Sequence, residues 1–316
     1  MTGTGRAFAA GLLRFLLAEL AMLCAAHGGP LTVATYNVEN YVVTDRRVGE
    51  VYHPAYPKPE AAKSALRAVI RALDADVLAV QEMGPAGYLE ELRRDLRAEG
   101  LDYPYVALAE ALDADRHVAA LSRFPFRRVQ THADLDFRYG EGRARVKRGV
   151  LEIVLPGDGS DLTLFLVHLH SRHTDRADDP GAASYRAGEA GAVRDLVLRR
   201  FPNPALARFL ILGDCNDTRN SRPLRLLTKR GQTAIAAFTK AVDRQGEAWT
   251  YYYAKDETYS RVDYILVSPG LAPAVPDGGA RVYDGPGVRD ASDHRPVVVR
   301  LDLPGKPAES DPVSRH

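Results

Sequence analysis

Cysteine is scarce in this chain, and charge of neither sign dominates it. Only Cys24 and Cys215 occur among 316 residues, which excludes a disulfide framework and a CxxC metal-ligand pair. Lysine and arginine total 42 against 41 acidic residues, so any attraction for nucleic acid or an anionic membrane must be local. Long polar or low-complexity tracts are also missing, and 46% hydrophobic residues are typical of a globular protein with a sizeable core.

The N-terminus carries the one long apolar segment. Residues 7–26 are almost entirely apolar and follow Arg6 in a short basic leader, as in a bacterial secretory signal peptide. Arg14 and Glu19 interrupt the segment, so an amphipathic N-terminal helix is the alternative. We expect residues 1–28 to be a signal peptide and the mature chain to be periplasmic or extracellular. Without a signal peptide the protein would be cytoplasmic.

From Pro30 onward, short β-branched segments alternate with longer helical patterns, and we find no repeat of fixed period. Strands are expected at residues 31–36, 77–80, 118–121, 149–155, 162–167, 209–212, 262–267 and 296–301. Helices are expected at 59–73, 88–98, 185–200 and 224–229, and the first has its apolar residues on one face. This alternation predicts the α/β class. Residues 304–316 are rich in proline, serine and charge, which is typical of a flexible tail.

Polar residues suited to metal and phosphate chemistry stand at the strand ends. Four strands finish on such residues, namely Asn37, Glu82, His168 and Asp214. Two other strands carry them at the front, with Asp263 before one and the pair Asp293 and His294 before the other. If all these positions converge, the last two strands run opposite to the first four. The sheets should therefore be mixed or largely antiparallel, which argues against a doubly wound parallel fold.

Several of these residues suit a magnesium ion. Magnesium prefers six oxygen ligands and is usually held by one or two carboxylates, which leaves positions for water and substrate phosphate. Glu82 is the main ligand candidate, and Asp293 would reach the ion directly or through water. Asn37 would add an amide oxygen or hold a phosphate oxygen. Taken alone, Glu82 is as well explained by a surface carboxylate at a strand exit.

Two pairs of residues suit attack by water on phosphorus. Asp214 would orient or deprotonate the water, and the Asn216 amide would donate to oxygens that gain charge in the transition state. His294 would donate to the phosphate, with Asp263 fixing its tautomer if their strands are neighbours. Ordinary explanations exist for both pairs, because Asp and Asn are frequent in turns and a core histidine is often satisfied by a carboxylate.

Other candidates are less specific. His168 is interpreted as a phosphate contact or proton donor. His168 and His170 also allow a zinc site, although no third histidine has the spacing typical of catalytic zinc. Arg148 and Arg186 would bind phosphate oxygens as substrate-binding residues, or else remain solvated surface charges.

Seven segments in this order closely resemble the endonuclease/exonuclease/phosphatase superfamily. They are TYNVEN (35–40), VQEM (80–83), LSRFP (121–125), VHLHSR (167–172), ILGDCND (211–217), RVDYILVS (261–268) and SDHRPV (292–297). Single motifs are weak, but seven in sequence order are highly specific. The resemblance implies a four-layer α/β/β/α sandwich of the deoxyribonuclease I type, with two mixed β-sheets and the active site at one edge. The match runs from about Leu31 to Leu301, so we expect a catalytic domain at 31–302, followed by the flexible tail at 303–316.

The resemblance also implies roles for matched residues. By motif, Glu82 is the metal-binding glutamate and Asp263 the aspartate that orients the histidine; the other matched residues are Asn37, His168, the pair Asp214 and Asn216, and the pair Asp293 and His294. We expect the metal ligands to be Glu82, Asn37 and Asp293, and the catalytic residues to be His168, Asp214, Asn216, Asp263 and His294. The stretch 115–118 before LSRFP is only loosely similar to the family, which leaves the partner of His168 open.

The implied activity is hydrolysis of phosphate esters with Mg²⁺ or Mn²⁺, most simply as a phosphodiesterase or nuclease. A phosphomonoesterase, a sphingomyelinase-like lipid phosphodiesterase and a non-catalytic binding module are the alternatives. Two features are compatible with binding of nucleic acid, namely the basic residues at 143–148 and the tyrosines Tyr251, Tyr252 and Tyr253. Neither is specific, and three tyrosines in a row are equally typical of a half-buried strand. We expect a monomer without an obligate protein partner.

Overall fold

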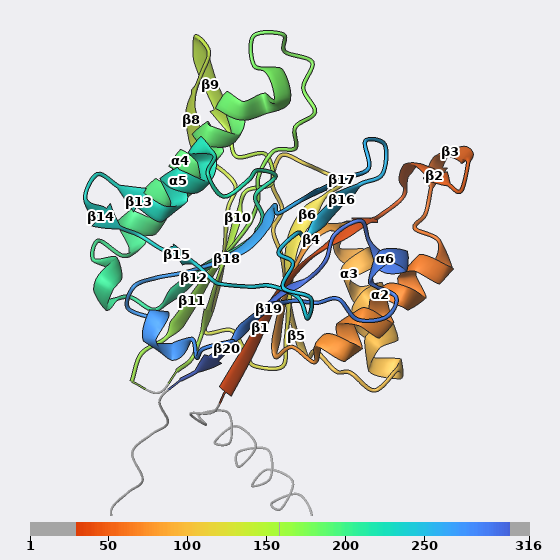
Figure 1. The fold of residues 1–316 in the computed structure, drawn as a ribbon, viewed down its shortest axis with the longest axis horizontal. Helices are drawn as coiled ribbons and strands as arrows, with labels where there is room; N and C mark the ends of the chain where they lie inside the picture. The colour runs from red at the N-terminus through yellow and green to blue at the C-terminus, as the bar shows by residue number, and fades with distance from the viewer. Residues whose placement is uncertain (1–29, 158, 304–316) are drawn as a thin grey trace, which may run out of the picture.

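The structure, a computed structural model, describes residues 30–157 and 159–303. Two six-stranded β-sheets pack face to face, and helices cover both outer faces (Figure 1). The expected signal peptide at 1–28 and residues 304–316 of the expected tail lie outside the described residues. Among the helices of the described ranges, none combines the length and the apolar character that crossing a membrane requires.

The first sheet has the order β19-β20-β1-β4-β6-β5. Its strands are β1 (Pro30–Tyr41), β4 (Val77–Met83), β5 (Tyr105–Leu108), β6 (His117–Ser122), β19 (Ala280–Val282) and β20 (Val297–Asp302). Only the β1–β4 pair is parallel, and β20 runs antiparallel to β1.

The second sheet has the order β15-β18-β12-β11-β10-β7. Its strands are β7 (Arg128–His132), β10 (Val150–Leu155), β11 (Leu162–His168), β12 (Phe209–Asp214), β15 (Ala237–Phe238) and β18 (Asp263–Val267). Here β11 and β12 are the parallel pair, and β18 runs antiparallel to β12. The predicted four-layer sandwich of two mixed sheets is confirmed, together with the strand directions inferred from the polar strand ends.

Apolar side chains on alternate strand positions divide the core into three layers. Val33, Val77, Leu164 and Leu210 belong to the layer between the sheets, whereas neighbours such as Leu78 face outward. The central strands are buried on both faces, which explains their nearly continuous hydrophobic sequences.

Helices α2 (Glu60–Leu73) and α3 (Ala86–Ala98) cover the first sheet, and α4 (Ala183–Arg200) and α5 (Arg222–Thr228) cover the second. All four were predicted within two residues at each end. In α2 the predicted apolar face is buried through Leu66, Val69, Ile70 and Leu73. A short helix, α6 (Val288–Ala291), precedes the segment that leads into β20, and the 3₁₀ turns are η2 (Pro180–Ala182), η3 (Pro204–Leu206) and η4 (Ala272–Ala274).

The short edge strands and four two-stranded ribbons were not predicted. The ribbons are β2 (Thr44–Val48) with β3 (Val51–Tyr56), β8 (Asp136–Tyr139) with β9 (Gly142–Arg145), β13 (Lys229–Arg230) with β14 (Thr233–Ala234), and β16 (Tyr251–Tyr253) with β17 (Thr258–Ser260). Most of their residues are exposed, so they lack the apolar runs from which strands were identified.

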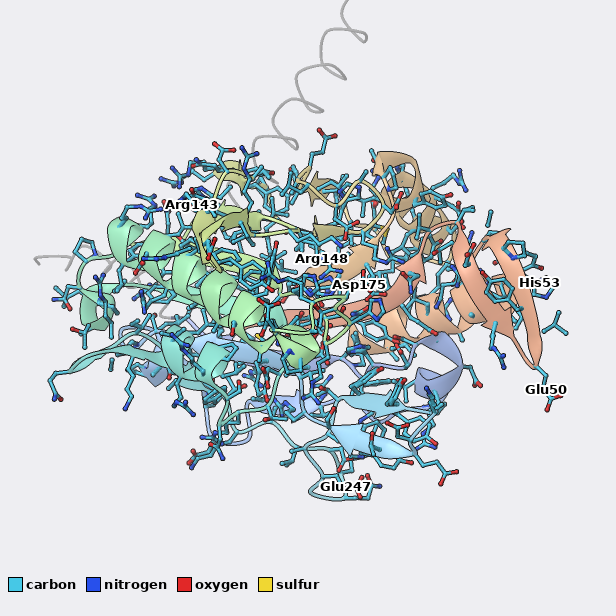
Figure 2. All side chains as sticks on the ribbon, turned by 90° about the horizontal axis from the view of Figure 1, so that it is seen from above. Glu50, His53, Arg143, Arg148, Asp175 and Glu247 are labelled. Atoms are coloured by element: carbon cyan, nitrogen blue, oxygen red, sulfur yellow. The ribbon has the colours of Figure 1, made fainter. Side chains whose placement is uncertain are left out.

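Seen from above the sandwich, Arg143 of β9 and His53 of β3 lie on opposite sides of the molecule, and Arg148 lies between them (Figure 2).

Candidate active site

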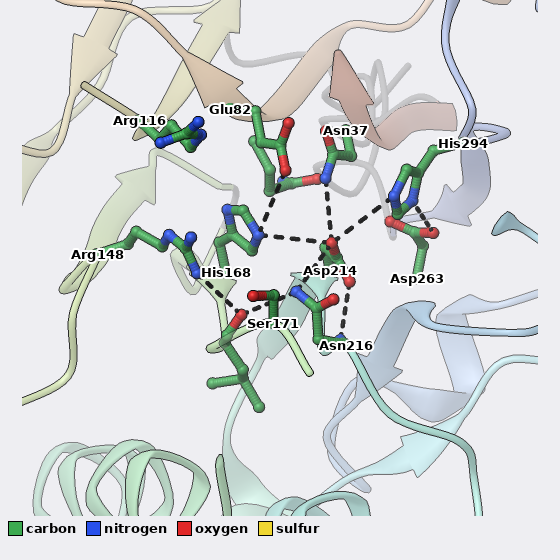
Figure 3. Close-up of polar contacts among 12 residues, drawn as sticks. Asn37, Glu82, Arg116, Arg148, His168, Ser171, Asp214, Asn216, Asp263 and His294 are labelled. Atoms are coloured by element: carbon green, nitrogen blue, oxygen red, sulfur yellow. Dashed lines mark hydrogen bonds and ion pairs between the residues drawn. The ribbon is translucent and has the colours of Figure 1, made fainter. Parts of the chain in front are cut away.

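Strand register brings the candidate residues together. The β11–β12 pairing sets His168 opposite Asp214, and the β12–β18 pairing sets Asp214 opposite Asp263. In the other sheet Asn37 is paired with Gln81, the residue before Glu82. The two sheets meet at this edge, where Asn37 Nδ2 donates to Asp214 Oδ2 at 3.0 Å (Figure 3).

Asp214 is the centre of the cluster. Its Oδ2 accepts from Asn37 Nδ2, and its Oδ1 accepts from the backbone N–H of Asn216 at 2.8 Å. The same Oδ2 lies 3.5 Å from His168 Nε2 and 3.9 Å from His294 Nε2. Burial, followed by the nearby charge of Asp263, raises the pKa of Asp214 to about 7. A carboxyl with such a pKa can accept a proton near neutral pH, which suits a general base.

Gly213 makes this arrangement sterically accessible. Its φ of +140° lies in a region that L side chains rarely adopt, and a Cβ there would stand 1.9 Å from the carbonyl oxygen of Val167. Only glycine therefore lets β12 approach β11 closely at the residue before Asp214.

His294 is fixed by one hydrogen bond to its ring and one to its backbone. Its Nδ1 lies 2.8 Å from Asp263 Oδ2, and its backbone N–H donates to Ser292 Oγ at 3.1 Å. Ser292 Oγ in turn donates to the carbonyl of Asn37 at 2.8 Å. Burial opposes the charged ring, but Asp263 and Asp214 outweigh it and raise the pKa of His294 well above its usual range. His294 therefore presents Nε2–H as a donor toward Asp214 and anything bound beside it.

His168 is electrostatically different. Burial, with the charges of Arg148 and His294, holds the pKa of His168 well below its usual value, so the ring is neutral. Its Nδ1 has no hydrogen-bond partner among the described residues. The partner of His168, left open by the sequence, is therefore on the Nε2 side, where Asp214 and Glu82 lie at 3.5 and 4.0 Å.

Oxygen atoms for a cation gather beside this cluster. Glu82 adopts φ +61°, a strained value for a residue other than glycine, and its Oε2 accepts from the Asn40 backbone N–H at 2.9 Å. Asp293 Oδ1 lies 4.0 Å from His294 Nε2 and remains partly exposed. Asn37 Oδ1 accepts from the backbone N–H of Glu39 at 3.0 Å. Carboxylate and amide oxygens are the ligands that hard divalent cations prefer.

Carboxylates crowd this end of the site. Partial burial, with the charges of Glu39 and Glu82, raises the pKa of Asp293 to about 7. Asp214, Asp263 and His294 also offer one ligand atom each within 4.8 Å of one another, a spacing consistent with a divalent metal. A cation would relieve the repulsion among these groups, so the residues present fit one.

The two predicted arginines bind groups of the protein itself. Arg148 donates from Nη1 to the Leu169 carbonyl at 3.2 Å, and its Nε lies 3.2 Å from Asp113 Oδ2. Arg186 donates from Nε and Nη2 to Asp217 Oδ2, each at 3.1 Å. Both side chains are buried and hold the segments that follow β11 and β12. Their binding of phosphate stays a prediction.

His168 and His170 do not form a ligand pair among the described residues. His168 faces Asp214, whereas His170 Nδ1 lies 2.8 Å from the Ser171 carbonyl, and its ring packs against Tyr185. Alternation along a strand predicted one face for both histidines, but β11 ends at His168 and His170 lies beyond the strand. Within the described ranges, no His/Cys/Asp/Glu metal cluster contains them.

Two charged residues near the site were missed by sequence reasoning. Arg116 donates from Nε to Asn40 Oδ1 at 2.6 Å. The backbone N–H of Asn40 in turn donates to Glu82, so the guanidinium of Arg116 borders the site (Figure 3). Glu189 of α4 is buried and accepts from the backbone N–H groups of Lys147 and His170. The helical spacing of Glu189 with the apolar face of α4 is the signal that identifies it as buried. Arg116 carries no comparable signal, because it lies in the loop before β6.

The comparisons with known proteins agree with this geometry. The family model described as the endonuclease/exonuclease/phosphatase family matches residues 34–294. Among curated proteins, no sequence is significantly similar to this chain.

Solved structures are similar in fold. An endonuclease/exonuclease/phosphatase family protein from Leptotrichia buccalis is 16% identical, with 86% of this chain and 99% of that chain covered and a TM-score of 0.59. The human Nocturnin catalytic domain with a bound sulfate anion is 14% identical over 87% of this chain and 95% of that chain, with a TM-score of 0.60. Sphingomyelinase C from Streptomyces griseocarneus is 18% identical over 86% of this chain and 99% of that chain, with a TM-score of 0.57. At these identities the likeness shows the fold alone. The family match over residues 34–294 shows more: the chain belongs to the endonuclease/exonuclease/phosphatase family.

Proposed function

We propose that this protein is a divalent-metal-dependent hydrolase that cleaves phosphodiesters by in-line attack of water. The observation that carries the proposal is the buried cluster in which Asp214 Oδ2 is bonded to Asn37 and lies within 4 Å of Nε2 of both His168 and His294. A base and two imidazoles around one small space can accept a proton from water and donate to phosphate oxygens.

The side chains divide this work according to their surroundings. Asp214 orients the attacking water and accepts its proton, which its raised pKa favours. His294, oriented by Asp263, donates from Nε2 to a phosphate oxygen. Asn216 donates from Nδ2 to Asp214 Oδ2 at 3.2 Å and to the Leu169 carbonyl at 2.9 Å, so it positions the base.

Glu82, Asn37 and Asp293 would hold Mg²⁺ or Mn²⁺, because their oxygens surround one side of the cluster. A bound divalent ion supplies charge stabilisation to the phosphate and its leaving oxygen. Two structural neighbours support this class of substrate, since one is a sphingomyelinase and the structure of the other holds a sulfate anion.

Hydrolysis of a panel of phosphate esters tests the proposal. The panel is bis-p-nitrophenyl phosphate, plasmid DNA, sphingomyelin and inositol phosphates, each with Mg²⁺, with Mn²⁺ and with EDTA. We expect metal-dependent turnover that Glu82→Ala and His294→Ala abolish. Arg289→Ala serves as the control and keeps the activity, because Arg289 lies in α6 and its guanidinium packs on Trp249, Tyr252 and Tyr259. Activity unchanged in the Glu82 and His294 variants would refute the site, and turnover of monoesters alone would favour a phosphomonoesterase.

We also propose export as a monomer, on the basis of the apolar N-terminal segment. Intact-mass measurement of the natively expressed protein tests the export, because a chain that begins at Met1 or Thr2 would contradict it. Light scattering of the purified protein tests the monomer.

A further inference from the structure

The β16–β17 ribbon is joined to the catalytic segment by backbone hydrogen bonds. Tyr251 forms an antiparallel bridge with His294, and the backbone N–H of Tyr252 donates to the Asp293 carbonyl at 3.0 Å. The backbone N–H of Arg295 donates to the Thr250 carbonyl. The position of β16 is therefore tied directly to the segment that carries Asp293 and His294.

This pairing aligns a row of rings. Side chains directly opposite each other on antiparallel strands lie on the same face, and the Tyr251 and His294 ring centroids are 4.7 Å apart at 36°. Tyr253, two residues farther along β16, shares that face and stacks on Tyr251 at 6.3 Å and 27°. The exposed fraction rises outward, from 6% for His294 to 39% for Tyr253. We call His294, Tyr251 and Tyr253 the aromatic row.

The opposite face of the ribbon is already filled. Tyr259 packs on Tyr252 and on Trp249, each at 4.7 Å between centroids. The guanidinium of Arg289 lies 5.6 to 5.8 Å from all three rings. Internal packing thus accounts for this second cluster, whereas the aromatic row continues from the catalytic histidine to the surface.

We infer that the aromatic row is a stacking subsite for the planar base of a nucleotide next to the scissile phosphate, so that the substrate class is a nucleic acid with accessible bases. This inference rests on the proposed function. A base attached to the cleaved phosphodiester is a flat ring held within a few bonds of His294, and bases stack on aromatic side chains regardless of sequence. The near-neutral charge of the whole chain is no obstacle, because stacking requires no basic surface.

The tip of the ribbon argues against a lipid surface as the ligand. It consists of exposed residues that include Lys255, Asp256 and Glu257, whereas insertion into a bilayer would require an apolar tip. The tyrosines lie instead along the flank of the ribbon, in line with His294.

Binding measured apart from turnover tests the inference. Fluorescence anisotropy with EDTA compares labelled oligothymidylate with an abasic oligomer of equal length, which has the same phosphates and no bases. Stacking of one base contributes roughly a 5- to 150-fold difference in Kd, from typical alanine-scan values. We expect wild-type protein to prefer oligothymidylate by such a factor, and Tyr253→Ala to lose most of the preference. Tyr251→Leu should lose it as well.

Tyr259→Ala is the matched control, because Tyr259 is an exposed tyrosine of the same ribbon on the other face. It should keep the preference for bases. Equal binding of both oligomers by wild-type protein, or equal effects of Tyr253→Ala and Tyr259→Ala, would overturn the subsite. So would weaker binding of Tyr253→Ala to sphingomyelin vesicles with unchanged binding to oligothymidylate. Hydrolysis of bis-p-nitrophenyl phosphate tests the proposed function separately, so the two failures are distinguishable.

Discussion

Replacing Asp263 by asparagine removes the charge behind His294 and keeps the size of the side chain. The carboxylate lies 2.8 Å from Nδ1 and is the largest of the effects that favour the charged imidazole. In the variant, burial is opposed by much less negative charge, so His294 should be neutral at neutral pH. An asparagine amide can also present Nδ2 to the ring and favour the wrong tautomer.

The size of the effect follows from these two losses. Positioned acid–base groups contribute about 10²- to 10⁴-fold to rate, so kcat for bis-p-nitrophenyl phosphate should fall by that factor, or about 3 to 5 kcal/mol. Loss of a charged hydrogen bond should also cost about 1.5–3 kcal/mol of unfolding free energy, measured by urea denaturation. Because Asp263→Asn lowers both kcat and stability, a second variant with a matched loss of stability is needed to separate chemistry from folding.

Asp243→Asn is the matched control for Asp263→Asn. Asp243 is also a buried carboxylate, bonded at 2.8 Å to Nη1 of Arg295, the residue after His294. It should cost a similar amount of stability and leave kcat within a few-fold of the wild type. Equal losses of kcat in both variants would refute the orienting role of Asp263, because the effect would then be one of folding alone.

Other consequences of the structure can be measured in the same way. Gly213→Ala places a Cβ against a carbonyl of β11 and should cost roughly 3 kcal/mol or more in urea unfolding. Gly191→Ala has open space inside α4 and should instead stabilise the protein by roughly 0.5–1 kcal/mol, because alanine favours a helix interior. Glu189 has its pKa raised to about 7, chiefly by burial, so the folded state keeps a proton that the unfolded state releases near pH 4.5. Its contribution to stability is therefore present below about pH 4.5 and lost as pH rises through 7. The unfolding free energy of the wild type should thus fall by roughly 3 kcal/mol more than that of Glu189→Gln over this pH range, and parallel curves of stability against pH for the two proteins would contradict this. The guanidinium of Arg116 borders the site, and we predict that its charge helps to bind the substrate phosphate. Arg116→Ala should then lower kcat/KM for phosphodiesters roughly 10-fold or more, and an unchanged value would contradict this role.

Much of the architecture could be predicted from local patterns. Apolar runs located the eight central strands and four helices, because buried strands and amphipathic helices impose a period on the sequence. The polar residues at the strand ends also predicted the relative direction of the strands. Asn37 lies toward the carboxyl end of β1 and Asp293 precedes β20, so the two residues can lie close together only if these strands are antiparallel, as they are. The exposed ribbons impose no such period and were missed.

Roles of individual side chains were harder to predict. Arg148 and Arg186 were predicted to bind phosphate, and that stays a prediction; the sequence did not indicate that Arg148 donates to the Leu169 carbonyl or that Arg186 donates to Asp217. From the sequence, Tyr251 could stack on a base or be an ordinary half-buried strand residue. The structure shows that its ring lies beside that of His294, because the two residues form a β-bridge.

The sequence by itself determined which residues form the central strands, which polar groups end them and which family they resemble, because these are properties of neighbours along the chain. Only the tertiary structure decided that Asp214 lies between two histidines, that Glu189 is buried and that an aromatic row leads outward from His294. Those facts depend on contacts between segments far apart in sequence, such as Asn37 and Asp214, whose geometry is set by the packing of the two sheets.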